Sequence, residues 1–323
     1  MVLYVDERWR GHHGIGRFAG QVLPRLHLPF RPIEGPSPLG LRALLSSAHL
    51  TAADRIYSPG FNASATRARQ LLTIHDLIHL DSSDEASRTK QLYYNCVVKP
   101  AVLRAGTVHT VSEFSKTRIQ EWLNSTGVMV VNVGNGVGRV FNASGLCEPL
   151  APRTFLYVGN TKPHKNAEVL FHALKLRPSY RLLVVTGDTA LAEESALRAG
   201  VERQVHAISG VSDERLSSLY RSVSGLLFPS LLEGFGLPPL EAVMSGARVA
   251  YSSECAAVVE VVGDAGHAVA KPRAAAEWAS AMDALLAVPR KLDPNVRTEL
   301  QRRYSWDAVG ARVNSSLGDW SSK

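Results

Sequence analysis

Short apolar segments alternate with segments of helical length along most of the chain, and this alternation limits the possible folds more than any other feature. A strand followed by a helix and then by another strand forms a parallel β-sheet with helices on its faces. Predicted strands are residues 2–5, 55–58, 71–75, 107–111, 128–133, 154–158, 181–186, 204–208, 225–228 and 248–251. Predicted helices cover 16–26, 88–104, 112–123, 273–287, 294–303 and 306–317, and others begin near 166, 189, 213, 238 and 256. The sequence therefore predicts an α/β protein with parallel sheets.

The segment 142–152 predicts where the chain divides. It is rich in small, polar and proline residues, as linkers are, and a new alternation of strands and helices begins directly after it. With 323 residues, of which 45% are hydrophobic, the chain is long enough for two domains that each bury a core. We therefore expect an N-terminal domain at 1–148 and a C-terminal domain at 149–304. The proline-rich segment 28–39 is predicted to be a loop.

The charge pattern limits the expected partners. The net charge is +7, and most of the excess lies in the first half of the chain. Such a surface suits an anionic lipid or a phosphate-bearing acceptor, or it is simply a solvated face, and the interspersed acidic residues favour the solvated face. Zinc-finger spacing, an aromatic RNA-binding signature and a concentrated basic helix are all missing from the sequence, so nucleic acid is not an expected partner.

The location and the redox state follow from two further patterns. No segment approaches the roughly 18 consecutive apolar residues of a membrane-spanning helix, and the first residues lack the features of a signal peptide. A cytoplasmic protein is expected, and a peripheral contact with the cytoplasmic face of the inner membrane stays open. Cys96, Cys147 and Cys255 lie far apart without metal-ligand spacing, so reduced thiols are expected.

A strand, a glycine-bearing loop and a helix are predicted around residues 225–241. The apolar run 225–228 reads as a strand, and Pro238 and Pro239 suit the first positions of a helix but not its interior. Gly234 and Gly236 stand just before that helix, where the missing side chains let the backbone approach a ligand closely. The unpaired N–H groups and the positive dipole end of the helix favour an anion such as a pyrophosphate.

Two glutamates flank this loop and complete the candidate site. Glu233 precedes the anion site, and Glu241 lies about one turn inside the helix. A carboxylate accepts two hydrogen bonds from a vicinal diol, so Glu241 suits the ribose hydroxyls, and Glu233 is left for the sugar beyond the phosphates. The alternative is that Glu241 only complements the helix dipole and that Gly-Phe-Gly is only a tight turn.

A second loop carries a candidate cation. Residues 155–166 run from a strand through a polar loop into a helix, and Lys165 stands near the start of that helix. Ligands of doubly wound sheets bind beyond the carboxyl ends of the strands, so Lys165 is expected to reach the same phosphates. A lysine there would neutralise the charge of a departing nucleotide diphosphate. The alternative is a surface lysine, and the flanking Gly159 and Asn166 favour function.

His75 and Asp76 end another apolar strand, again at a carboxyl end. His75 is a candidate to hydrogen-bond the donor sugar, while Asp76 caps a turn or orients the imidazole. A structural histidine and a metal hydrolase are the alternatives, but the sequence offers few companion metal ligands.

The loop after the first strand contains part of a dinucleotide-binding pattern. Gly14 and Gly16 match its first two glycines, but the next one is Gly20, one position late. A nucleotide-sugar epimerase or dehydrogenase is therefore the less favoured alternative. His12 and His13 are expected to face solvent.

Taken together, the motifs resemble those of the family 4 retaining glycosyltransferases of GT-B architecture, over almost the whole chain. The motifs that carry the resemblance are Glu233-Gly-Phe-Gly-Leu-Pro-Pro-Leu-Glu241, Val158-Gly-Asn-Thr-Lys-Pro-His-Lys-Asn166, Gly14-Ile-Gly-Arg17, Thr73-Ile-His-Asp76, Thr110-Val-Ser-Glu-Phe-Ser115 and Asn135-Gly136. The resemblance implies two Rossmann-like domains with parallel sheets that face a cleft. It also implies that the acceptor binds the N-terminal domain, that the nucleotide sugar binds the C-terminal one, and that the last helix, 305–323, returns to the N-terminal domain.

The resemblance also implies a role for each candidate residue. Lys165 would bind the diphosphate, Glu233 the donor sugar, Glu241 the ribose, and His75 the sugar near the reacting carbon. Asn160 stands where many relatives have an arginine, and Lys162 or Arg17 would supply that charge. The catalytic set is His75, Lys165 and Glu233, and the donor-binding set is Gly16, Asn160, Lys162, Gly210, Val211, Gly234, Phe235, Gly236, Leu237 and Glu241.

The implied reaction is the transfer of a hexose from a nucleotide sugar to a hydroxyl of a glycan or lipid-linked acceptor, with retention of configuration. Front-face attack is favoured over double displacement through Glu233. No Asp-x-Asp motif is found, so neither a metal nor another cofactor is expected. The resemblance is to bacterial polysaccharide and O-antigen mannosyltransferases, which favours GDP-mannose as the donor. A non-catalytic protein that binds sugar nucleotides is the main alternative.

Overall fold

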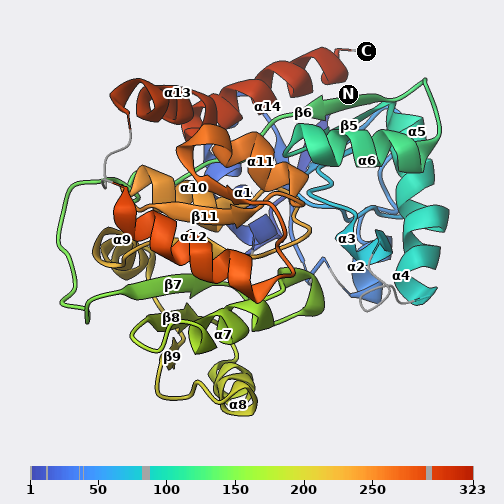
Figure 1. Ribbon diagram of the computed structural model, residues 1–323. Helices are drawn as coiled ribbons and strands as arrows, with labels where there is room; N and C mark the ends of the chain where they lie inside the picture. The colour runs from blue at the N-terminus through green and yellow to red at the C-terminus, as the bar shows by residue number, and fades with distance from the viewer. Residues whose placement is uncertain are drawn as a thin grey trace. The chain divides into compact units, whose positions relative to one another are not determined.

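The computed structural model describes residues 2–11, 14–35, 37–38, 40–81, 88–288 and 293–322. The chain forms two compact units, the first made of residues 1–136 and 303–323 and the second of residues 137–302 (Figure 1). The predicted ranges placed the change of domain at 148/149 instead. The predicted exposure of His12 and His13 lies outside the described residues.

Residues 137–148 belong to the second unit because they are hydrogen-bonded to its helix α9 (Asp213–Ser222). Ser217 Oγ donates to the carbonyl oxygen of Val140 at 2.8 Å, and Arg221 Nη1 donates to that of Asn142 at 2.9 Å. The linker composition of this segment was visible in the sequence, but these partners are about 75 residues away along the chain and were not.

The strands of the first unit all pair in parallel. The strands are β1 (Leu3–Asp6), β2 (Arg31–Ile33), β3 (Arg55–Ser58), β4 (Arg69–Leu72), β5 (Thr107–Thr110) and β6 (Met129–Asn132). Four of them pair in the order β2-β1-β3-β4, and β5 pairs with β6. A bridge between Thr73 and His109 links the two groups. Since β2 and β3 lie on opposite sides of β1, the order of the strands reverses at β1.

One prediction for this unit was wrong. The segment 28–39 was predicted to be a loop, but residues 31–33 form strand β2, which pairs in parallel with β1. Pro32 cannot donate a backbone hydrogen bond, and at the edge of a sheet one side of the strand has no partner, so the proline is tolerated there.

The helices of the first unit connect these strands. They are α1 (Gly14–Val22), η1 (Leu23–Arg25), α2 (Leu41–Leu45), α3 (Ile78–Asp81), α4 (Arg88–Tyr93), η2 (Tyr94–Val98), α5 (Lys99–Ala105), α6 (Glu113–Leu123) and α14 (Trp306–Ser321). The predicted helix 88–104 is an α-helix with a π-helical middle. Ser112 caps α6, as predicted, because its Oγ accepts from Ser115 N at 3.0 Å.

The terminal helix α14 packs in the first unit. Asn314 Nδ2 donates to the carbonyl oxygen of Arg25 at 2.7 Å, and Trp320 Nε1 donates to that of Ala105 at 2.9 Å. His109 Nε2 lies 2.9 Å from Ser316 Oγ. These contacts join the two ends of the sequence that this unit contains.

The second unit contains a six-stranded parallel sheet in the order β12-β11-β10-β7-β8-β9. Its strands are β7 (Thr154–Val158), β8 (Arg181–Val185), β9 (Val205–Ile208), β10 (Leu226–Phe228), β11 (Val249–Ser252) and β12 (His267–Val269). From β7 the chain builds outward to β9, and it then returns to the other side of β7 and builds outward to β12. The reversal between β7 and β10 is the topological switch point of a Rossmann sheet, where ligands bind beyond the carboxyl ends of the strands.

Helices cover this sheet and bury its core (Figure 1). They are η3 (Pro163–Lys165), α7 (Glu168–Lys175), α8 (Thr189–Ala199), α9, α10 (Leu237–Met244), α11 (Ala256–Val262), η4 (Gly263–Ala265) and α12 (Ala275–Ala287). Helix α13 (Pro294–Tyr304) follows α12 in the sequence, and its last two residues belong to the first unit. Helices α7 and α12 pack together, and Trp278 of α12 is fully buried among Leu170, Leu174 and Met282. The predicted α/β class with parallel sheets is confirmed, and the arrangement of the two domains around a cleft stays a prediction.

Candidate functional site

Two loops meet at the switch point of the second unit. The first loop leads from β7 to η3, and the second leads from β10 to α10. The backbone N–H of Leu231 donates to the carbonyl oxygen of His164 at 2.8 Å, and Ser230 Oγ lies 3.4 Å from the same oxygen. The two loops are therefore joined, although 66 positions of sequence separate Ser230 from His164.

The joined loops bring together two of the predicted catalytic residues. Lys165 Nζ donates to both carboxylate oxygens of Glu233, at 2.7 Å and 2.8 Å. The Lys165 side chain is 19% exposed and that of Glu233 is 11% exposed. Water therefore screens this ion pair less than it screens a pair on the open surface. A charged group at this position can reach a ligand at the carboxyl edge of the sheet.

The start of α10 lies in the same loop, at Gly236. Its φ of +101° is in the region that glycine adopts readily, and the two prolines predicted at the helix start follow it. A Cβ at Gly236 would lie 2.6 Å from Cγ2 of Val258 in α11, so the neighbouring helix also requires a glycine here. Glycine has no side chain to cap the helix, and Pro238 and Pro239 have no N–H, so the start of α10 offers an acceptor its positive dipole end and the N–H of Leu237.

Glu241 lies inside α10 and is only 2% exposed. The hydroxyl of Tyr220, in α9, donates to Glu241 Oε2 at 3.4 Å. A buried carboxylate must be hydrogen-bonded to be tolerated, and this contact is part of that requirement. Its predicted bond to the ribose stays a prediction.

The loop after β7 holds the remaining residues of the predicted phosphate site. Asn160 and Lys162 are exposed, and Asn160 Oδ1 accepts from the backbone N–H of Lys162 at 3.2 Å. The hydroxyl of Tyr157 donates to the carbonyl oxygen of Asn160. Asn166 has a φ of +53°, and its Nδ2 donates to the carbonyl oxygen of Pro272 at 2.8 Å. This part of the loop is thus held by its own hydrogen bonds.

Four other predicted residues lie elsewhere. Gly210, with a φ of +65°, and Val211 follow the edge strand β9, which is separated from β7 by β8. His75 and Gly16 belong to the first unit. His75 Nε2 lies 3.0 Å from the carbonyl oxygen of Pro59. The roles predicted for these four residues stay predictions.

Gly16 also has a structural reason to be a glycine. A Cβ at this position would overlap the carbonyl oxygen of Gly11 in the preceding loop. The close approach of helix α1 to that loop therefore requires the missing side chain, whatever the ligand.

Two residues next to Glu233 were missed by the sequence analysis. Cys255 is buried at the start of α11, in the loop after β11, and its burial, together with the charge of Glu233, raises the pKa of the thiol to about 12. Tyr157 of β7 has its pKa raised by burial and then by the same carboxylate. The sequence did offer one signal for Cys255, which is its position between a predicted strand and a predicted helix, where site residues of such sheets lie. Both groups stay protonated at neutral pH and shape the surroundings of Glu233.

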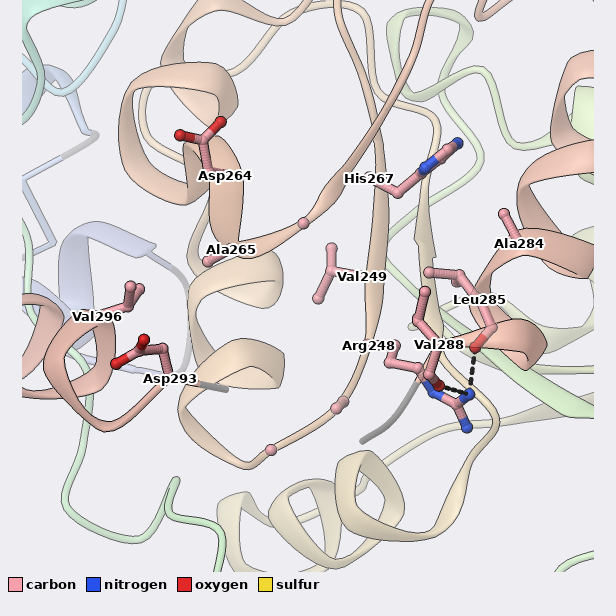
Figure 2. Close-up of a pocket in the computed structure, with 13 residues that line it drawn as sticks. Arg248, Val249, Asp264, Ala265, His267, Ala284, Leu285, Val288, Asp293 and Val296 are labelled. Atoms are coloured by element: carbon pink, nitrogen blue, oxygen red, sulfur yellow. Dashed lines mark hydrogen bonds between the residues drawn. The ribbon is translucent and has the colours of Figure 1, made fainter. Parts of the chain in front are cut away.

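The second unit also contains a cavity that is separate from this site (Figure 2). It has a volume of about 550 Å³, and its lining includes Arg248, Val249 and His267, which stand at the amino ends of β11 and β12. Arg248 Nη1 donates to the carbonyl oxygens of Leu285 and Val288. The predicted site residues lie at the carboxyl edge instead, and none of them lines this cavity.

Among the described residues, no three His, Cys, Asp or Glu side chains form a cluster that could ligate a metal ion. In the same part of the chain, no helix has the length and hydropathy that crossing a membrane requires.

Most of the second unit is similar to a known protein family. Residues 146–303 match the family model described as Glycosyl transferases group 1. The match covers most of the second unit and shows which family this part of the chain is similar to. The Lys165–Glu233 pair and the start of α10 lie within the matched segment.

Curated proteins that are similar to this chain include two from bacteria. The O-antigen chain mannosyltransferase RfbU of Salmonella typhimurium is 29% identical over 187 residues, which are 57% of this chain and 52% of the relative. The O-antigen chain mannosyltransferase B of Escherichia coli is 28% identical over 231 residues, or 66% of this chain and 60% of the relative. The matches thus span only about half to three-fifths of these relatives.

A solved structure supports the fold of the whole chain, including the residues outside the segment 146–303. A glycosyltransferase from Rickettsia africae matches with a TM-score of 0.70 and 17% identity, and covers 99% of this chain and 98% of its own. At this identity the likeness shows the fold alone, which is the GT-B fold that the motifs predicted.

Proposed function

We propose that the protein is a retaining glycosyltransferase that transfers mannose from GDP-mannose to a hydroxyl of a glycan or lipid-linked acceptor in bacterial polysaccharide synthesis. The observation that carries this proposal is the Lys165–Glu233 ion pair beside the start of α10, at the switch point of the second unit, most of which matches the group 1 family model. The choice of mannose is supported by the names of the curated relatives, which are mannosyltransferases.

In this proposal Lys165 binds the diphosphate of the donor. A lysine ammonium has three N–H donors, and two contacts go to the oxygens of Glu233. The third donor is left for a phosphate oxygen, while Glu233 holds the ammonium in place. The N–H groups of Gly236 and Leu237 and the positive dipole end of α10 act on the same anion, while Pro238 and Pro239 contribute no N–H.

Glu233 and Glu241 bind the two sugars of the donor. Glu233 accepts hydrogen bonds from the hexose, and Lys165 holds its carboxylate in position for them. Glu241 accepts from the ribose, with Tyr220 fixing the other side of its carboxylate.

The transfer step is a front-face displacement. The bond between the anomeric carbon and the diphosphate oxygen breaks, and the acceptor oxygen bonds to that carbon on the same face. The departing diphosphate oxygen takes the proton of the acceptor hydroxyl. Negative charge grows on the leaving group, where Lys165 and the backbone amides just before Pro238 stabilise it. Each preorganised hydrogen-bond donor of this kind contributes about 3–4 kcal/mol to such a step. No resident metal is invoked, and the nucleotide sugar is a substrate.

The nucleotide is identified by a thermal-shift screen against GDP-, UDP- and dTDP-sugars, because only a ligand that binds the folded state raises the unfolding midpoint. Turnover is then measured as the amount of nucleoside diphosphate that is released. GDP-mannose is expected to stabilise and to be consumed when a suitable acceptor is supplied. Stabilisation by GDP-mannose without its consumption would favour the non-catalytic alternative. Stabilisation only by a sugar of another nucleotide would reject GDP-mannose as the donor.

The site itself is tested by Lys165→Ala, with Arg215→Ala as a matched control. Arg215 forms an ion pair with Glu148 at 3.1 Å in the same unit, but its side chain is 53% exposed. Lys165→Ala is expected to lower kcat by about 100-fold or more, and the control to leave it within about twofold. Full activity of Lys165→Ala would reject this site.

A further inference from the structure

The first unit contains a cavity that none of the predicted residues explains. It has a volume of about 530 Å³, which is within the ~300–1,000 Å³ typical of small-molecule pockets. Phe61 and Asn62, which follow β3, and His79 of α3, which follows β4, line it. It therefore lies beyond the carboxyl ends of two neighbouring strands, which is where doubly wound sheets bind their ligands.

Aromatic rings form much of the wall of this cavity. Tyr94 stands at the centre of the group, with its ring centroid 4.3 Å from that of His79 and 5.6 Å from that of Phe61. Tyr93 is held in place because its hydroxyl lies 3.1 Å from the N–H and 3.3 Å from the carbonyl oxygen of Ala63. The wall is thus a preformed aromatic surface, and large rings lose little conformational entropy when a ligand packs on them.

Polar groups interrupt this wall. Asn62 is only 8% exposed although it lines the cavity, and its amide offers both donors and an acceptor. Tyr94 is 2% exposed, and its hydroxyl has no hydrogen-bond partner among the described residues. Such a buried hydroxyl is unfavourable unless a ligand supplies the missing hydrogen bond. The exposed Lys90 adds a positive charge to the lining, and no carboxylate is present in the described part of it.

We propose that this cavity binds a sugar ring of the acceptor glycan, an inference that rests on the proposed glycosyltransferase function. A pyranose has an apolar C–H face, which packs on aromatic rings, and a polar edge of hydroxyls, which need both donors and acceptors. The partly exposed rings of Phe61 and Tyr93 suit the face, and the amide of Asn62 and the hydroxyl of Tyr94 suit the edge. Lys90 complements a phosphate or a carboxylate next to that sugar.

A lipid chain is the less suitable occupant. A hydrocarbon cannot hydrogen-bond the buried amide of Asn62 or the hydroxyl of Tyr94, so binding it would leave both groups without a partner and without access to water. The sequence pattern did not single out this site, because its residues come from four separate segments and no single segment carries a motif for it.

The binding test is saturation-transfer NMR with the methyl α-glycosides of mannose, glucose, galactose and N-acetylglucosamine, without donor. The test variant is Tyr94→Phe, which removes only the unpaired hydroxyl and is expected to leave the unfolding midpoint unchanged or higher. The matched control is Tyr57→Phe, because Tyr57 is also a fully buried tyrosine of this unit but does not line the cavity.

At least one glycoside is expected to receive saturation in the wild type, and Tyr94→Phe and Asn62→Ala are expected to weaken its binding about 5–20-fold, with the control unchanged. Absence of transfer to every glycoside would overturn the inference. Equal weakening by the control, or no effect of Tyr94→Phe and Asn62→Ala, would overturn it as well.

Kinetics separate this inference from the proposed function. If the wild type consumes the donor, Tyr94→Phe is expected to raise the KM for the acceptor about 5–20-fold, while the donor KM and hydrolysis of the donor without acceptor stay the same. An increase seen only with a polyprenyl-linked acceptor, and not with the same glycan free of lipid, would assign the cavity to the lipid and overturn the inference. If the wild type consumes no donor, the proposed function fails, and the binding test still decides about the cavity.

Discussion

The Lys165–Glu233 ion pair makes a quantitative prediction about stability. At 2.7 Å, two unit charges attract each other by about 6 kcal/mol if the effective dielectric constant is about 20. Desolvation cancels much of this attraction, because the two side chains are only 19% and 11% exposed. Removing one partner leaves the other charge mostly desolvated, so Lys165→Met is expected to destabilise the second unit by about 2–3 kcal/mol. An exposed pair would contribute only about 0.2–1 kcal/mol.

The assay is a double-mutant cycle in urea, with Lys165→Met, Glu233→Gln and the two together. The double variant removes both charges and keeps both shapes, so it is expected to recover most of the loss, which gives a coupling energy of about 1–3 kcal/mol. The Arg215–Glu148 pair, whose side chains are 53% and 27% exposed, is the reference and is expected to give less than about 1 kcal/mol. A coupling for Lys165–Glu233 no larger than that of the reference would refute the reasoning, since the pair would then behave as a solvated one.

Three further predictions concern stability. Gly236→Ala is expected to cost about 2–4 kcal/mol in urea unfolding, because of its positive φ and the helix behind it, whereas Gly187→Ala, which has open space around it, should be neutral. Burial lowers the pKa of His109 to about 3, below the ~6.5 of an unfolded histidine, so its contribution to stability is full above pH 6.5 and falls by about 1.4 kcal/mol per unit as the pH drops towards 3. Unfolding measured between pH 7 and 5 should therefore show a smaller loss for His109→Gln, and an equal loss would contradict this account. Asn314→Ala removes the bond to the carbonyl of Arg25 and is expected to destabilise the first unit by about 1–3 kcal/mol by the same assay, and no change would show that α14 docks without it.

Local structure followed from the sequence wherever the local signal was strong. Strands β3 and β7 match the predicted residues, because buried parallel strands are continuous apolar runs. Helix α6 begins after Ser112, as its capping chemistry predicted. The helix start after Gly236 followed from its two prolines.

Two short edge strands, β2 and β12, were missed for the opposite reason. Strands β2 and β12 have three residues each, and each pairs on one side only. Such a strand depends on its neighbour for its hydrogen bonds, so its own residues carry little signal, and in β2 the central proline pointed to a loop. The limit of the second unit, at residue 137, was missed because bonds to α9 decide it.

The sequence alone determined which residues stand at the carboxyl ends of strands, because apolar runs and turn residues are local patterns. Only the tertiary structure decided which of these ends are neighbours. Lys165 and Glu233 are 68 positions apart and bond to each other because the sheet places β10 beside β7. Cys255 lies near Glu233 because it follows β11, the strand on the other side of β10. The order of strands in a sheet is set by the packing of the whole unit, which no short segment of the chain encodes.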